Sequence, residues 1–435
     1  MTSEQAKTSD EQERAKALAY YEAAVETARE IPDVPATTPQ RPIKKVGVIG
    51  AGTMGGGIAM CFANIGIPVT IVELKQEALD RGLALIRKNY ERSQQRGKIT
   101  SQDVEQRVAL ITGALRIDDL ADVDLVIEAV FEDMGIKKEI FGKLDAICKP
   151  GAILATNTSG LDVNVIAAVT KRPNDVIGLH FFSPANVMKL LEVVRGKATA
   201  KDVIATSLSI AKQIGKNAVL VGVCPWFVGN RMLGARGEQA NKLILQGALP
   251  WDVDRVLTDF GFPMGPFAMG DLAGLDIGWN AKTSKGASIR DRLCEQGRRG
   301  QKAGAGYYNY DPQTRERTPE PKVAELIAEF AREKGFTTRS IGDAELLERC
   351  LYPMINEGAK ILEEGIALRA SDIDVVWVNG FGFPAYRGGP MYYANKIGLK
   401  RIVDALERFR AEDKSEFWKP APLLAKLAAE GKTFN

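Results

Sequence analysis

Residues 46–56, VGVIGAGTMGG, decide the fold of this chain, because an unbroken apolar run passes directly into glycines at positions 50, 52 and 55. The pattern GxGxxG between a strand and a helix is typical of a dinucleotide-binding βαβ unit. Its first glycine allows a tight turn, its second lets a pyrophosphate approach the backbone, and its third lets the helix pack on the strand. We therefore expect Gly50, Gly52, Thr53, Met54 and Gly55 to hold a dinucleotide at the N-terminus of the following helix.

The next apolar stretch supplies an acidic residue at the distance that such a unit requires. Residues 67–73, IPVTIVE, predict a second strand that ends in Glu73, 18 residues beyond Gly55. A carboxylate about 20 residues after the glycines hydrogen-bonds the ribose hydroxyls, and its charge repels a 2′-phosphate. The spacing favours NAD over NADP. The alternative is a turn-forming glycine loop in an unrelated α/β domain.

Polar side chains follow two further apolar runs of the predicted sheet. Residues 123–133, VDLVIEAVFED, predict a buried strand that ends in Glu132, and residues 151–159, GAILATNTS, predict a strand that delivers Asn157, Thr158 and Ser159. In open parallel sheets the carboxyl ends of the strands are where ligands bind. These side chains are candidates to orient a substrate oxygen and the nicotinamide ribose, although Asn-Thr-Ser is also ordinary helix-capping chemistry.

The stretch 176–196, VIGLHFFSPANVMKLLEVVRG, contains His180, the only histidine of the 435 residues, and Glu192 twelve positions later. A histidine and a carboxylate on neighbouring apolar strands make a general base with its orienting anion. A lone histidine is more often a structural residue, so this role depends on the neighbouring dinucleotide unit. The strand predicted from AVLVGV at 218–223 completes the alternation of strands and helices, which indicates a doubly wound sheet.

The chain outside this sheet is expected to be helical. Residues 11–31 have helical apolar spacing, and a proline-rich linker follows them. Residues 238–278 and 356–398 share an Asp-x-Asp helix start, a Gly-Phe-Pro turn, a Gly-Pro and an Ile-Gly close in the same order, which indicates two copies of one helical unit. We predict no strand beyond Pro225. The predicted organisation is an N-terminal helix and linker (1–44), a Rossmann-type α/β domain (45–224), a first helical repeat (225–310), a linker (311–341) and a second helical repeat (342–435).

Composition excludes several classes of function. Lys plus Arg number 58 and Asp plus Glu 55, so the net charge of +3 offers no broad attraction for nucleic acid or an anionic membrane. Five scattered cysteines and one histidine predict no metal centre. No apolar run approaches the roughly 18 residues of a membrane span. The acidic start is not typical of a signal peptide and the final KTFN is not a peroxisomal address, so we expect a cytoplasmic protein.

From Val46 to its C-terminus the chain resembles the 3-hydroxyacyl-CoA dehydrogenase family. The resemblance rests on six motifs in the family's order: GVIGAGTMGGGIA, EAVFEDMGIKKEIF, ATNTSGL, GLHFFSPANVMKLLEVV, FVGNRM and KAGAGYYNY. The duplicated helical region is similar to the dehydrogenase part of bifunctional enoyl-CoA hydratase/3-hydroxyacyl-CoA dehydrogenases. No hydratase half is present, and the N-terminal helix and linker resemble the connection to one, which implies a missing domain or a separate hydratase partner. A solvated N-terminal extension is the other interpretation.

The resemblance implies catalytic roles for four residues. It makes His180 the catalytic base and Glu192 its partner. Ser159 would contact substrate and cofactor, and Asn230 in FVGNRM would position the thioester or the 3-oxygen.

The resemblance also implies contacts to the cofactor NAD. Glu132, Lys137 and Lys302 occupy positions at which the family touches NAD. Where single-function members have HFFNP this chain has HFFSP, so Ser183 offers a shorter side chain, and Glu73 stands where many members have aspartate.

The function expected from the resemblance is reversible, NAD-dependent oxidation of (S)-3-hydroxyacyl-CoA to 3-oxoacyl-CoA in fatty acid β-oxidation. One alternative is a related NAD-dependent dehydrogenase that acts on a small hydroxyacid. Another is a catalytically silent NAD-binding protein, as are the lens crystallins related to this family. Because two helical repeats in one chain can pack against each other, we expect a monomer, or a dimer formed by other surfaces.

Overall fold

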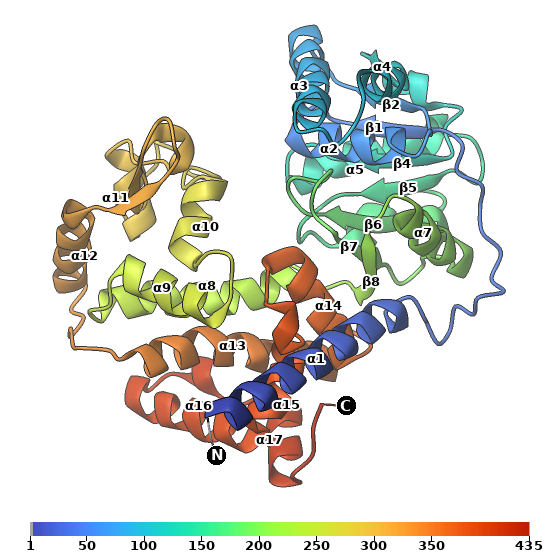
Figure 1. Cartoon of the computed structure of the whole chain (residues 1–435). Helices are drawn as coiled ribbons and strands as arrows, with labels where there is room; N and C mark the ends of the chain where they lie inside the picture. Colours follow the sequence, from blue (N-terminus) through green and yellow to red (C-terminus); the bar gives the residue numbers. More distant parts are fainter. Residues whose placement is uncertain (1–2, 435) are drawn as a thin grey trace.

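The computed structural model describes residues 3–434 as an α/β part and a helical part (Figure 1). One sheet of eight strands, in the order β3-β2-β1-β4-β5-β6-β7-β8, organises the α/β part. The strands from β3 to β6 run parallel in the order of a Rossmann fold, whereas β7 lies antiparallel to β6 and β8 runs parallel to β7. The strands are β1 (Val46–Ile49), β2 (Val69–Val72), β3 (Ile111–Ala114), β4 (Leu125–Glu128), β5 (Ile153–Thr156), β6 (Val176–Phe181), β7 (Leu190–Arg195) and β8 (Asn217–Gly222).

Both faces of the sheet are buried, as its nearly continuous apolar strands require. Along β1, Val46 and Val48 belong to one apolar cluster and Ile49 to another. Helices α2, α3, α4 and α7 complete the first cluster, and α5 and α6 contribute to the second. The doubly wound α/β architecture predicted from the sequence is therefore confirmed. The helices are α2 (Thr53–Ala63), α3 (Gln76–Gln95), α4 (Ser101–Ala109), α5 (Met134–Ile147), α6 (Val163–Ala167) and α7 (Lys201–Gln213), with short 3-10 turns η1 (Ile117–Leu120) and η2 (Pro173–Asp175).

Two helical segments follow the sheet and pack on each other chiefly through α8 and α13 (Figure 1). The helical architecture expected from the repeat is therefore present. The first segment contains α8 (Gly229–Leu245), α9 (Pro250–Phe260), α10 (Pro266–Ala273), α11 (Ile289–Glu295) and η3 (Gln301–Ala303), and α12 (Pro321–Glu333) leads to the second. The second contains α13 (Asp343–Glu363), α14 (Ala370–Phe381), η4 (Ala385–Arg387), α15 (Pro390–Ile397), α16 (Leu399–Asp413), η5 (Glu416–Trp418) and α17 (Pro422–Ala429).

The prediction that no strand occurs beyond Pro225 is wrong. An antiparallel pair, β9 (Tyr308–Tyr310) and β10 (Arg317–Pro319), forms a small hairpin that joins the end of the first helical segment to the predicted linker. All three residues of β10 are exposed and lie in a charged stretch, so no apolar alternation marks this strand in the sequence.

Equivalent aspartates begin equivalent helices in the two segments. Asp254 accepts hydrogen bonds from two backbone N–H groups in the first turn of α10 and from the hydroxyl of Tyr308. Asp374 does the same for α15, and here the hydroxyl comes from Tyr20 at 2.7 Å. The glycine before each helix leaves room for its aspartate, since a Cβ on Gly265 or Gly389 would lie within 2.4 Å of it. The Asp-x-Asp and Gly-Pro elements of the repeat are thus parts of one local structure.

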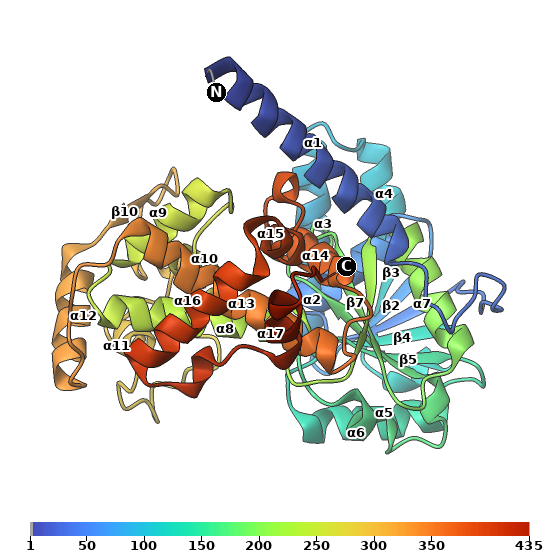
Figure 2. The same ribbon diagram turned by 90° about the horizontal axis from the view of Figure 1, so that it is seen from below.

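Tyr20 belongs to α1 (Ser3–Thr27), which lies across α14 (Figures 1 and 2) and also contacts η4. The neighbouring hydroxyl of Tyr21 donates to Asn379 of α14, and Asn379 also accepts from Asn217 at the start of β8. After α1 the chain runs back along the sheet, where Arg41 binds two carboxylates. The N-terminal segment therefore contacts both parts of the molecule.

None of the helices described between residues 3 and 434 is both long and apolar enough to span a bilayer. Within the same residues, no three His, Cys, Asp or Glu side chains come together as a metal site would require.

Candidate active site

The turn between β1 and α2 has the geometry that a pyrophosphate needs. Gly50 adopts φ +103°, and a Cβ on Gly55 would lie 1.9 Å from the carbonyl oxygen of Gly50, so only glycine lets α2 pack this closely. Gly52 differs from both, because it is exposed and a Cβ built on it meets no atom within 4 Å. No side chain caps the first turn of α2. The N–H groups of this turn therefore face open space in which phosphate oxygens can accept from them.

A cleft of about 690 Å³ opens in front of this turn. Its volume lies in the usual range of ligand pockets, about 300–1,000 Å³. Of the predicted cofactor residues, Gly55 is buried behind the turn, whereas the others of the first βαβ unit line the cleft: Gly50, Gly52, Thr53, Met54 and Glu73. The opposite wall comes from residues after β3 and β4 and from α5, among them Leu115, Arg116, Val130, Phe131, Ile136 and Ile140.

Glu73 lies immediately after β2 and faces the glycine turn. One carboxylate oxygen accepts from the N–H of Ala51 at 3.2 Å and the other from the N–H of Leu74 at 2.8 Å. Two backbone bonds hold the carboxylate at the cleft wall while each oxygen keeps capacity for a second donor. An open glycine cradle with a fixed acceptor beside it fits a dinucleotide with free ribose hydroxyls.

His180 and Glu192 stand directly opposite each other on antiparallel β6 and β7. Nδ1 of the imidazole lies 2.7 Å from Oε2 of the carboxylate, and both side chains are buried. The other carboxylate oxygen accepts from the backbone N–H of Gly229 at 2.9 Å. The strand pairing thus brings together the two residues that the sequence singled out.

This hydrogen bond assigns the tautomer of His180. A carboxylate only accepts, so Nδ1 carries a proton, and in the neutral ring Nε2 therefore has the lone pair. The ring packs near Phe182 and Phe227, with centroid distances of 4.3 and 5.8 Å. The arrangement can accept a proton at Nε2, and Glu192 stabilises the imidazolium that results.

Ser159 and Glu132 meet beyond the carboxyl ends of β5 and β4. Glu132 Oε1 accepts from the N–H and the hydroxyl of Ser159 at 2.7 and 3.0 Å and from the hydroxyl of Thr158 at 2.6 Å. Burial raises the pKa of Glu132, but these bonds and the nearby Lys137 outweigh it, so the net shift is downward. The sequence predicts that this strand runs to Glu132, but β4 ends at Glu128. Glu132 lies in the loop after β4, and this loop turns toward the residues that follow β5, where Thr158 donates to Glu132.

Lys137 lies beneath this loop rather than at the open face of the cleft. Its ammonium is 2.7 Å from Glu128 and 3.4 Å from Glu132, and the side chain is 1% exposed. Glu128 also accepts from the hydroxyl of Thr156 at 2.7 Å. The structure therefore brings Lys137 to Glu132, through which it reaches the site.

Asn230 is the second residue of α8 and directly follows Gly229, whose N–H binds Glu192. Asn230 is therefore one residue along the chain from the backbone donor to Glu192. Glycine is required before it, because a Cβ on Gly229 would lie 2.4 Å from the ring of Phe381.

Ser183 and Lys302 do not join the cleft. Ser183 is exposed in the loop after β6, where it precedes a cis proline. Lys302 lies on η3 in the first helical segment, is 59% exposed, and forms an ion pair of 2.6 Å with Asp276 of the same segment. Like His180, Ser159 and Glu132, neither residue is among those that line the cleft.

Two supporting residues lacked a clear signal in the sequence. Lys216 is 4% exposed and donates to the carbonyl oxygens of Ala185 and Met188 at 2.5 and 2.6 Å, which fixes the loop that follows β6. Burial lowers its pKa. Gly229 was hidden in FVGNRM beside Asn230; the N-terminal position of that glycine in a helix is the signal that identifies it as a backbone donor.

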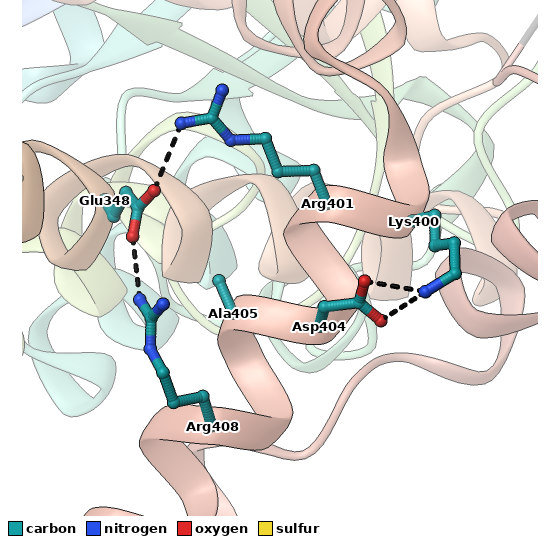
Figure 3. A pocket seen from close by; sticks show the side chains of 6 residues that line it. All are labelled: Glu348, Lys400, Arg401, Asp404, Ala405 and Arg408. Carbon is teal, nitrogen blue, oxygen red and sulfur yellow. Dashed lines mark hydrogen bonds and ion pairs between the residues drawn. The ribbon is translucent and has the colours of Figure 1, made fainter.

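A second depression, of about 480 Å³, lies between α13 and α16 (Figure 3). Its cations are already bonded within it. Glu348 accepts from Arg401 and Arg408 at 3.3 and 2.9 Å, and Asp404 binds Lys400 at 2.7 Å (Figure 3). It lies in the second helical segment and contains none of the predicted site residues.

A Rossmann sheet that bears a dinucleotide turn and a histidine–carboxylate pair on its carboxyl edge is the architecture of a dinucleotide-dependent dehydrogenase. The 3-hydroxyacyl-CoA dehydrogenase NAD binding domain matches residues 45–224, and the C-terminal domain of the same family matches twice, at 227–310 and 346–434. The chain therefore belongs to the 3-hydroxyacyl-CoA dehydrogenase family. The family and the cofactor NAD predicted from the sequence are confirmed.

Relatives with known names agree with this assignment. The peroxisomal bifunctional enzyme of Danio rerio is 45% identical over 413 residues, which cover 90% of this chain and 57% of that enzyme. The human peroxisomal bifunctional enzyme is 42% identical, with 91% of this chain and 57% of the enzyme covered. The chain thus spans little more than half the length of these relatives.

Solved structures match over nearly the whole chain. The dehydrogenase part of multifunctional enzyme 1 from C. elegans is 32% identical, with a TM-score of 0.69 over 94% of this chain and 98% of that one. The 3-hydroxybutyryl-CoA dehydrogenase of Escherichia coli is 29% identical, with a TM-score of 0.75 over 90% and 99% of the two chains.

The cytoplasmic location expected from the sequence is contradicted by these relatives. The Danio rerio and human relatives are named peroxisomal enzymes, and the plant relatives are named peroxisomal or glyoxysomal enzymes. The expectation rested only on targeting patterns that were not found, and such patterns are short addresses that the folded domains do not encode.

Proposed function

We propose that this chain catalyses the reversible oxidation of (S)-3-hydroxyacyl-CoA to 3-oxoacyl-CoA, with NAD as the hydride acceptor. The observation that carries the proposal is the buried pair of His180 and Glu192, 2.7 Å apart, on the sheet edge that also bears the glycine turn. Family membership supports the thioester substrate, and bound NAD supplies the acceptor for the hydride.

We propose that His180 is the base. Nε2 takes the proton of the C3 hydroxyl, and the electron pair of the O–H bond forms the C3–O double bond. The C3 hydrogen leaves with the electron pair of the C3–H bond as a hydride, for which NAD would be the acceptor. The imidazolium that results shares its Nδ1 proton with Glu192, whose other oxygen stays bonded to Gly229. In the reverse direction His180 returns the proton to the alkoxide oxygen. Asn230, at the adjacent N-terminus of α8, orients the thioester or the 3-oxygen.

The remaining residues are proposed to position the cofactor and the substrate. Gly50, Gly52, Thr53, Met54 and Gly55 shape the pyrophosphate cradle, and Glu73 accepts from ribose hydroxyls. Ser159 meets substrate and cofactor while Glu132 fixes its hydroxyl at 3.0 Å, and Lys137 holds Glu132 from below. Ser183 and Lys302 stay proposals from the family resemblance, and both side chains are exposed.

An assay of NADH oxidation separates this proposal from its alternatives. Acetoacetyl-CoA is the substrate, free acetoacetate is the control, and the absorbance of reduced nicotinamide is the readout. Consumption with the thioester alone is expected. Consumption with the free acid alone indicates a small-hydroxyacid dehydrogenase, and NADH binding without consumption indicates a silent NAD-binding protein.

We also propose the division of the chain into segments 1–44, 45–224, 225–310, 311–341 and 342–435. The contact between α8 and α13 supports an internal pairing of the two helical repeats, and hence a monomer, which light scattering tests. The relatives' names favour a peroxisomal setting in fatty acid β-oxidation and a second enzyme activity, such as an enoyl-CoA hydratase, in the same polypeptide or in a partner.

A further inference from the structure

The second helical segment touches the catalytic sheet directly. Residues that lead from α13 into α14 extend the sheet edge, because Gly222 at the end of β8 donates to the carbonyl oxygen of Ile366 at 2.7 Å. Val221 and Ala367 form an antiparallel bridge at the same place. Helix α14 then lies against β7 and β8.

The last residue of α14, Phe381, connects this contact to the histidine. Its ring meets that of Phe182 edge to face at a centroid distance of 5.5 Å, and Phe182 lies 4.3 Å from the ring of His180. Phe381 also covers Gly229, where a Cβ would lie 2.4 Å from its ring. One aromatic side chain of the second segment thus packs against both the residue beside the base and the residue that binds Glu192.

Arg231, two residues after Gly229, forms ion pairs with two carboxylates of the second segment. Its Nε lies 2.7 Å from Glu357 of α13, and its two terminal nitrogens bind Glu364 at 2.5 and 2.7 Å. The side chain of Arg231 is 18% exposed and that of Glu357 is 16% exposed. A bidentate arginine with a third bond is restrained in direction as well as in distance.

We infer that the second helical repeat positions the catalytic pair through the first turn of α8, with Arg231 as the positioning residue and Phe381 as its packing counterpart. The inference rests on the proposed function of His180 and Glu192. The N–H of Gly229 is a backbone donor to Glu192, so the place of this turn decides the direction of the carboxylate. A displacement of about 1 Å at a reacting group can cost about 10²-fold in rate.

The test is the Arg231→Gln variant, assayed for acetoacetyl-CoA reduction by the whole chain. We expect kcat to fall by about 10- to 10²-fold, with the KM for NADH within about twofold of wild type, because the glycine cradle is untouched. Arg231→Lys keeps one ion pair but not the fork, so it should restore part of kcat. A merely structural role would lower the melting temperature and leave the kcat of the folded fraction unchanged.

Arg255→Gln is the matched control. Arg255 of α9 also joins the two segments by a bidentate ion pair, to Asp343 at 2.8 and 3.0 Å, but it lies away from the first turn of α8. Its loss should leave kcat unchanged. If Arg231→Gln fails to fold, Glu364→Gln decides the question, because this carboxylate is 45% exposed and its loss also releases the fork.

The outcomes separate the two proposals. If the wild type shows no activity, or if it is active and His180→Gln is equally active, the proposed function fails. If the wild type is active and His180→Gln is not, while folded Arg231→Gln and Glu364→Gln both keep wild-type kcat, the positioning role of the second repeat is wrong and the proposed function stands.

Discussion

Replacing Glu192 by glutamine probes how much the partner of the base contributes. The carboxylate is fully buried and has two bonds, to Nδ1 of His180 at 2.7 Å and from the N–H of Gly229 at 2.9 Å. In the variant the amide oxygen keeps the Gly229 donor, which turns the amide NH₂ toward His180. Nδ1 must then accept, so the proton moves to Nε2 and the base is blocked.

The magnitude follows from the charge that is lost. A hydrogen bond to a charged group contributes about 1.5–3 kcal/mol, and two unit charges about 4 Å apart at an effective dielectric constant of about 20 attract by about 4 kcal/mol. Since about 1.4 kcal/mol corresponds to tenfold in rate, kcat should fall by between about 10-fold and about 10³-fold. Because the wrong tautomer also blocks the base, we expect the fall in kcat to lie near the upper end of this range.

The assay is acetoacetyl-CoA-dependent oxidation of NADH, with NADH affinity measured separately by fluorescence. Glu348→Gln is the control, because Glu348 also binds two cations but lies in the second helical segment. We expect Glu192→Gln to bind NADH as the wild type does and Glu348→Gln to keep full activity. A Glu192→Gln enzyme within threefold of wild-type kcat would refute the role of the pair.

Two further predictions concern the cofactor cradle and the pH dependence of stability. Gly52→Val should fold normally but weaken NAD binding by at least about tenfold, a loss of about 1.4 kcal/mol, because the new side chain enters the open space in front of α2. Gly55→Ala should instead lower the melting temperature, because its Cβ would lie 1.9 Å from a carbonyl oxygen. Equal NAD affinity in the wild type and Gly52→Val would contradict the role of the glycine turn as the cofactor cradle. Burial raises the pKa of Asp374 from 3.8 to about 8. Between these pH values the folded state therefore keeps a proton on Asp374 that the unfolded chain has released. The contribution of Asp374 to stability falls as the pH rises from about 4 to 8. The melting temperature should therefore decline less over this range in Asp374→Asn than in the wild type, and parallel curves would show that burial does not control this aspartate.

The parts of the fold that follow from short-range pattern could be predicted from the sequence. Strands β1, β2, β5 and β6 are apolar runs with polar or glycine ends, and the turn after β1 carries its own signature in Gly50, Gly52 and Gly55. Strand β3 gives no such signal, since only the first of its four residues is buried at the sheet edge. The periodic spacing of apolar residues reflects burial, so an exposed strand lacks this pattern and is not predicted from it.

In the candidate site, too, contacts between residues near each other in the sequence could be predicted, whereas contacts between distant residues could not. His180 and Glu192 are only twelve residues apart. The sequence predicts them on neighbouring strands, and in the structure they face each other on β6 and β7. The bond from Gly229 to Glu192 and the contact of Phe381 with Phe182 join residues 37 and 199 positions apart, which depends on how the helical segments pack on the sheet. No spacing within the sequence encodes such packing.

Whether His180 is the base is decided by the rate of acetoacetyl-CoA reduction in His180→Gln beside the wild type, with NADH binding followed on the same samples. Loss of a general base costs about 10²- to 10⁴-fold. We predict that kcat falls in this range while NADH affinity and melting temperature stay near those of the wild type. Wild-type turnover in His180→Gln, with NADH bound normally, would contradict the assignment of His180 as the base.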